Sequence, residues 1–220
     1  MGSDDAPHDA PADASHLTPE EKRGPRTLHV ALLLLAVLLV VSVVSNPEMV
    51  LPRDSTLHGA HHTDEAAGLE IPVPVGWRAD GPEAAEFGTT RMVPTGTGEA
   101  LSVRILAGRM EPGNAAAAIA DDQGAATALA EIVQQYVLGV TGTRDDVRIA
   151  PVESELGEGT AVSYVVVPTD GAEGSGGLVY AAVFGEGEER SWLAYLSTSQ
   201  NSSPSPRWVD RLVGNIQRAG

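Results

Sequence analysis

A short histidine-rich segment offers side chains that metal ions prefer. His58, His61 and His62 stand close together and are followed by two carboxylates, Asp64 and Glu65. Imidazole combined with carboxylate suits zinc, copper or nickel. The segment lies in a flexible stretch with no second shell to orient the ligands, so binding would cost ordering entropy. We therefore assign no metal ligand and expect a solvated linker, which leaves open whether these histidines bind a metal.

Carboxylates are the catalytic groups that remain in the C-terminal part of the chain. From Thr63 onward the sequence contains no histidine, lysine or cysteine, which excludes serine–histidine triads, histidine bases and Schiff-base lysines. The paired acids are Asp121 with Asp122, Asp145 with Asp146, and Glu153 with Glu155. We expect the first pair on a helix, the second at the start of a strand and the third on the solvent side of a strand. No catalytic residue and no cofactor-binding residue is assigned, and no cofactor is expected.

Three tryptophans are the largest apolar side chains of this part of the chain. Trp192 and Trp208 are expected in the core. Trp77 ends a Pro-Val-Gly-Trp turn and precedes Arg78, so we expect it to be partly exposed. Trp77 and Arg78 are therefore the candidate ligand groove.

The longest apolar run covers residues 28–45, LHVALLLLAVLLVVSVVS. As a helix rising about 1.5 Å per residue it is long enough to span a bilayer. Lys22, Arg23 and Arg26 precede it, and basic residues flank the cytoplasmic side of membrane helices. We expect a single-pass cell-membrane protein with its N-terminus in the cytoplasm and its C-terminal domain outside. Cleavage of the run as a signal peptide is the alternative.

Composition divides the chain into four regions. Residues 1–26 are acidic and rich in proline and alanine, which predicts a disordered cytoplasmic tail. Residues 27–46 form the transmembrane helix and residues 47–67 a tether. Residues 68–220 form an extracytoplasmic domain that is long enough for a single hydrophobic core.

The charge and the cysteine count narrow the choice of partners. The formal net charge is −16 and the chain has no cysteine. An acidic external domain is repelled by nucleic acid and by anionic headgroups, so we expect an envelope protein as partner and no nucleic acid. The absence of cysteine excludes disulfides and a lipid attached through a thiol.

Alternating apolar and polar residues predict a series of strands in the domain. The alternation is clearest over residues 101–107. The other predicted strands cover residues 69–73, 87–93, 147–155, 160–167, 178–184 and 192–197, with hairpin loops at 157–159 and 185–189.

Apolar residues at helical spacing predict two helices. The first covers residues 114–138 and is ended by Gly139. The second begins at Ser205 as N-cap and Pro206 as the first helical residue. Its apolar stripe consists of Val209, Leu212, Val213 and Ile216. Asp210 is expected on the opposite face. The fold class is therefore α+β, an antiparallel sheet flanked by helices.

Residues 68–77, GLEIPVPVGW, form a short strand followed by a Pro-x-Gly-Trp turn. This segment resembles the opening of the Mog1/PsbP-like fold as found in LpqN-type envelope proteins. The order of strands, helix, four strands and terminal helix is similar too. The resemblance implies an α/β/α sandwich and a binding or accessory role in the envelope, with no catalytic residues to carry over. The chain departs from the LpqN type in having no cysteine for a lipid.

These observations favour a noncatalytic, membrane-anchored envelope module that binds a protein or a neutral ligand. The alternative is a carboxylate-dependent cell-wall enzyme, for instance a glycosidase. That enzyme would need two acids on opposite walls of one cleft.

Overall fold

The chain divides into two compact units, Met1–Asn46 and Pro47–Gly220. The computed structural model describes residues 57, 59–85, 87–95, 103–113, 115–169, 176–198 and 204–220 of the second unit, and only Val30 and Leu34 of the first. The predicted cytoplasmic tail, the rest of the predicted transmembrane helix and residues 47–56 of the predicted tether lie outside the described residues. Within those that are described, no helix has the length and apolar character needed to cross a bilayer.

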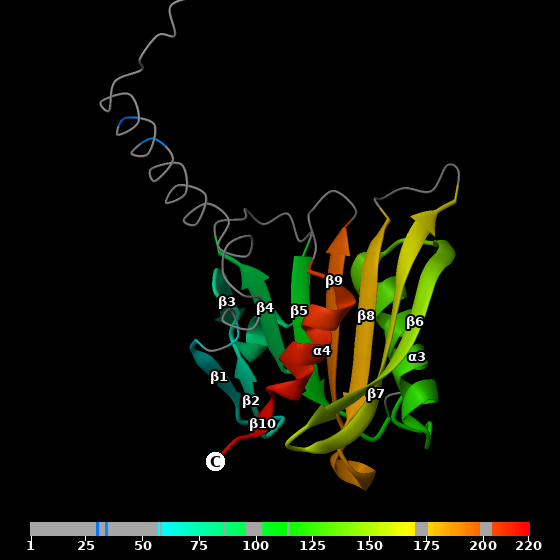
Figure 1. Cartoon of the computed structure of the whole chain (residues 1–220). Helices are drawn as coiled ribbons and strands as arrows, with labels where there is room; N and C mark the ends of the chain where they lie inside the picture. Colours follow the sequence, from blue (N-terminus) through cyan, green and yellow to red (C-terminus); the bar gives the residue numbers. More distant parts are fainter. Residues whose placement is uncertain are drawn as a thin grey trace, which may run out of the picture. The chain divides into compact units, whose positions relative to one another are not determined.

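A seven-stranded sheet forms the centre of the second unit (Figure 1), in the order β3-β4-β5-β9-β8-β7-β6. All six pairings are antiparallel. Its strands are β3 (Trp77–Asp80), β4 (Thr90–Pro94), β5 (Val103–Arg109), β6 (Gly142–Ser154), β7 (Gly157–Pro168), β8 (Gly177–Phe184) and β9 (Ser191–Thr198). The described residues thus form a mostly antiparallel α+β structure, as predicted.

A second, three-stranded sheet was not predicted. It consists of β1 (His61–Asp64), β2 (Leu69–Pro72) and β10 (Gln217–Arg218), in the order β1-β2-β10. The pairing of β1 with β2 is antiparallel, with His61 opposite Pro72. Residues 61–67, which we had assigned to the tether, therefore belong to the folded domain. Buried Asp64 explains why: its carboxylate accepts hydrogen bonds from the backbone N–H of Ala67 and from the hydroxyls of Thr89 and Thr90.

The two faces of the large sheet pack against different helices, because successive side chains of a strand point to opposite faces. On one face, α4 (Pro206–Gly214) and residues of the small sheet cover buried side chains that include Tyr180 and Tyr195. On the other face, α3 (Asp122–Val133) covers Tyr164 and Trp192. Figure 1 shows the red helix α4 in front of the sheet and the green helix α3 beside β6 and β7.

Helix α3 begins later than predicted. Residues 115–118 form turns, and Asp121 is the N-cap, its carboxylate accepting a hydrogen bond from the backbone N–H of Gly124. One π-helical turn, η3 (Gln134–Leu138), follows α3 and ends at Gly139, whose φ is 67°. The predicted end of the helix is thus confirmed, since this left-handed conformation favours glycine.

Helix α4 begins where it was predicted to begin, with Pro206 as its first residue. The predicted stripe of apolar side chains is buried. Asp210 does not face away from the sheet, however. Its carboxylate accepts hydrogen bonds from the Arg148 guanidinium on β6, at 2.5 and 3.3 Å, and from the Tyr180 hydroxyl on β8, at 3.0 Å. Burial and the Asp210 charge raise the pKa of Tyr180 well above its ordinary value.

The hairpin between β6 and β7 also differs from its prediction. Its two turn residues are Glu155 and Leu156, while Gly157 and Gly159 lie within β7. A Cβ at position 159 would lie 2.1 Å from the Val183 carbonyl oxygen of β8. Close approach of the neighbouring strand therefore explains this glycine, which we had placed in a loop.

A buried polar chain joins η3 to the sheet. The Tyr164 hydroxyl donates to Oε1 of Gln134 at 2.9 Å, and Nε2 of Gln134 donates to the Val140 carbonyl at 3.2 Å. The Arg144 guanidinium lies 4.8 Å from the centre of the Tyr164 ring. Burial raises the pKa of Tyr164 to about 12.

We expect Tyr164→Phe to weaken the dependence of stability on pH at high pH. Because the folded protein holds the phenolic proton more tightly than the unfolded chain, the free energy of unfolding is intact below pH about 10. It falls as the pH rises through the folded pKa of about 12. Urea unfolding on both sides of pH 10 measures this. At neutral pH the variant has a free energy of unfolding about 1 kcal/mol lower, because it lacks the hydrogen bond to Gln134. Above pH 10 its free energy of unfolding falls less steeply than that of wild type.

Tyr136→Phe is the matched control, since its side chain is 75% exposed. The same alkaline slope for Tyr164→Phe and wild type would contradict the expectation.

Candidate functional site

A cleft of the described domain lies where β5 ends. This main cleft encloses about 610 Å³ between the end of β5, the loop of residues 110–120 and the short helix η4 (Gly187–Glu189). Its lining includes Arg109, Met110, Glu111, Pro112, Ala117 and Arg190. A side cleft of about 380 Å³ shares Arg109, Glu111, Pro112 and Gly113 and adds Phe87 and Trp192. Arg109, Glu111, Pro112 and Gly113 are thus the common wall of both clefts.

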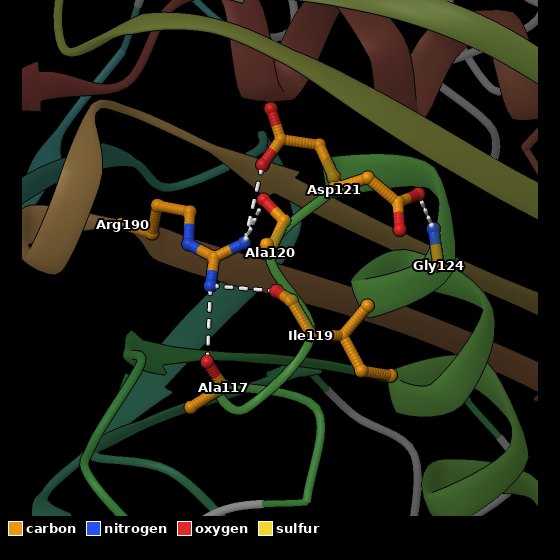
Figure 2. A network of polar contacts seen from close by, with 7 residues as sticks. Ala117, Ile119, Ala120, Asp121, Gly124 and Arg190 are labelled. Carbon is orange, nitrogen blue, oxygen red and sulfur yellow. Dashed lines mark hydrogen bonds and ion pairs between the residues drawn. The ribbon is translucent and has the colours of Figure 1, made fainter.

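Arg190 also lines the main cleft, and Figure 2 shows its polar contacts with the loop before α3. Its Nη2 donates to the carbonyl oxygens of Ala117 and Ile119, at 3.1 and 2.9 Å. Its Nη1 lies 3.4 Å from the Asp122 carboxylate at the start of α3 and 3.5 Å from the Ala120 carbonyl. The side chain is only 11% exposed. Both terminal nitrogens of the guanidinium therefore have acceptors in the loop or at the start of α3. Arg190 holds this loop in place and is not a free cation.

Trp192 forms the floor of the side cleft. Its indole N–H donates to the Arg109 carbonyl at 3.1 Å, and its ring lies 4.9 Å from that of Phe87. Gly88 has φ +82°, and a Cβ there would lie 2.6 Å from the indole ring. This position requires glycine for its backbone conformation and for the close approach of the ring. The aromatic floor is therefore built into the fold.

The common wall carries one cation and one anion. Arg109 and Glu111 are exposed, whereas Met110 between them is 5% exposed, and its backbone N–H donates to the Arg190 carbonyl. No described side chain pairs with either charge. The clefts thus present two available opposite charges above an apolar surface.

The predicted groove residues lie elsewhere. Trp77 is only 9% exposed, and its ring centre lies 6.4 Å from that of Tyr195 and 6.5 Å from that of Trp208. The expectation that Trp77 is partly exposed is wrong, because pairing of β3 with β4 turns the indole towards α4. Arg78 is exposed and pairs with Asp80 two residues along β3. Neither residue lines the two clefts.

The histidine-rich segment does not converge on one point. His61 and His62 are adjacent in β1 and so project to opposite faces of the strand. The Asp64 carboxylate already accepts hydrogen bonds from Ala67, Thr89 and Thr90. His58 lies outside the described residues. Across the described ranges, no three His, Asp or Glu side chains are placed to hold a metal ion.

The paired acids have structural positions. Asp121 caps α3, and Asp122 pairs with Arg190. Asp145 and Asp146 lie at an irregularity of β6, where Asp146 has φ 51°. Glu153 lies opposite Glu158 in the β6–β7 ladder. Glu155 is in the turn and not on the strand, so it does not share a strand face with Glu153.

Sequence reasoning missed Arg109, Glu111 and Arg190. One signal was present, since Glu-Pro-Gly directly follows the most regular strand and indicates a loop leaving the sheet. Nothing local connects that loop with Arg190, which is 73 residues beyond Ala117.

Comparisons with known proteins give one solved structure and one family. The solution structure of cyanobacterial PsbP (CyanoP) from Synechocystis sp. PCC 6803 is similar, with a TM-score of 0.48 and 12% sequence identity, covering 72% of this chain and 91% of that chain. That structure is of the PsbP type named in the sequence resemblance, and the LpqN type stays a prediction. No curated protein matches the chain. The Fibronectin-attachment protein (FAP) domain matches residues 61–219, from β1 to the end of β10. The chain therefore belongs to the FAP domain family.

Proposed function

We propose that this protein is a noncatalytic attachment module of the cell envelope that binds an extracellular protein. The observation that carries the proposal is the extent of the family match. Residues 61–219 include every described strand and both described α-helices of the second unit. The family takes its name from attachment to fibronectin, so fibronectin is the first partner to test.

The chemistry of the domain supports binding over catalysis. Residues 63–220 contain no histidine, lysine or cysteine. Among the described side chains that line the two clefts, Glu111 is the one carboxylate. A glycosidase needs two carboxyl groups flanking the scissile bond. The cleft instead offers apolar surface with two charges at its wall, an arrangement typical of recognition.

Anchoring in the membrane is the second part of the proposal. The apolar run of residues 28–45 is the anchor, and the basic residues before it keep the N-terminus in the cytoplasm. The domain that begins at β1 then stands outside the cell, where an extracellular protein can reach it. Its net charge disfavours association with anionic lipid.

Binding of plasma fibronectin tests the proposal. We expect the full chain, purified in mild detergent, to bind immobilised fibronectin saturably and to ignore immobilised serum albumin. Biolayer interferometry measures both. A chain unfolded in urea and assayed after dilution distinguishes binding by the folded domain from adhesion of exposed apolar segments. Equal signals on fibronectin and albumin would contradict the proposal.

A further inference from the structure

We propose that the two clefts, which share Arg109, Glu111, Pro112 and Gly113, receive an extended segment of the protein partner. This segment carries an acidic and a basic side chain next to an apolar one. The acidic side chain pairs with Arg109, the basic one with Glu111, and the apolar one enters the main cleft. The inference rests on the proposed function, and it names the surface and the chemistry that the partner must present.

Two exposed charges of opposite sign lie next to each other on the common wall. Arg109 and Glu111 stand on either side of buried Met110, both exposed and unpaired by any described side chain. Several other cations of the described domain are engaged, for instance Arg148 with Asp210 and Arg190 with Asp122. The chain has a net charge of −16, so Arg109 is a local positive charge on an acidic protein. It attracts a carboxylate of the partner. Glu111 selects a cation close to it.

Hydrogen bonds within the domain hold the residues that line the clefts. Arg190 ties Ala117 and Ile119 to the sheet, and Trp192 is held below the side cleft by its bond to the Arg109 carbonyl. Both sides of the common wall are therefore shaped before a partner arrives. Preformed clefts cost little ordering free energy on binding.

The two clefts adjoin the same stretch of chain. The common wall borders both clefts, so a peptide that lies along it can place side chains into each cleft in turn. An extended peptide alternates its side chains in this way. Main-cleft residues Pro112, Ala117 and Ala118 offer apolar contact without competing charge.

Charge reversal is the test, with immobilised plasma fibronectin as probe and the full chain in detergent. We expect Arg109→Glu and Glu111→Arg each to weaken binding about tenfold, because each replaces an attraction at the interface with a repulsion. Ala118→Trp, which fills the main cleft from an exposed position, is expected to weaken binding to a similar extent.

Matched controls separate the local effect from net charge. Arg207→Glu on α4 and Glu155→Arg in the β6–β7 turn make the same charge changes at exposed sites outside both clefts. We expect these two to bind within about twofold of wild type, since distant surface charges are screened by salt. Urea unfolding of each variant should match wild type, because the substituted side chains are exposed.

The outcomes distinguish the two proposals. Absence of wild-type binding overturns the proposed function and this inference with it. Wild-type binding that none of the three cleft variants weakens overturns the inference alone. Tighter binding by Glu111→Arg than by Glu155→Arg overturns the mixed-charge segment, since it indicates a purely acidic partner.

Discussion

Replacing Leu212 with aspartate is expected to lower the free energy of unfolding by about 4 kcal/mol or more. Leu212 is fully buried in α4, within the core between the large sheet, the small sheet and the helix. The substitution removes the apolar contacts of the leucine and places a carboxylate in an apolar core. The free energy of unfolding of a domain is only about 5–15 kcal/mol. This single substitution therefore removes a large part of the stability of the domain.

Tryptophan fluorescence during urea unfolding of the full chain measures the effect, because all three tryptophans lie in the domain. Arg207→Ala is the control. It changes an exposed position of the same helix and should shift the free energy by no more than about 0.5 kcal/mol. Leu212→Ala, expected to cost about 2–5 kcal/mol, keeps the experiment informative where the aspartate variant does not fold. Equal midpoints for Leu212→Ala and Arg207→Ala would contradict docking of α4.

Helix α4 was predictable because its signals are local. Ser205, Pro206 and the spacing of Val209, Leu212 and Val213 lie within a few turns of chain, and each agrees with the others. The position of Asp210 was not predictable in this way. Its partner Arg148 is 62 residues away, and local spacing gives no information on a pair formed across a sheet.

The long strands were predicted for a similar reason. β5 and β8 have regular apolar patterns, and their bounds differ from the expected ranges by at most two residues. β1, β3 and β10 have two to four residues each, which is too short for a period of two to be recognised. β1 also has the polar sequence HHTD, so its composition indicated a linker. Its strand character comes from pairing with β2 and from Asp64, and neither is visible locally.

The clefts could be predicted least. The strongest aromatic candidate, Trp77, is in the core, because an indole after a tight turn is placed by the strand that follows. The residues that shape the clefts come from β5, the 110–120 loop, η4 and the start of β9. The bond between Trp192 and Arg109 spans 83 residues. Only the fold brings these positions together.

Replacing Arg190 with alanine is expected to destabilise the domain by about 2–3 kcal/mol and to release the loop that closes the main cleft. The change leaves the carbonyls of Ala117 and Ile119 without their donor and the Asp122 carboxylate without its cation. Water reaches part of this loop, which keeps the cost below that of a fully buried charge. The guanidinium is irreplaceable because its fixed fork reaches several acceptors at once, whereas a lysine ammonium is a single compact donor group.

Three measurements on the full chain test this role. Urea unfolding gives the loss of stability, proteolysis at the 110–120 loop reports its release, and fibronectin binding reports the state of the cleft. Arg190→Lys should recover less than half of the lost stability. Arg109→Ala, which removes an exposed cation that also lines the main cleft, should leave stability and protease resistance as in wild type while weakening binding. If Arg190→Ala weakens binding yet leaves stability and proteolysis unchanged, Arg190 contacts the partner directly and is not the brace that its four hydrogen-bond acceptors indicate.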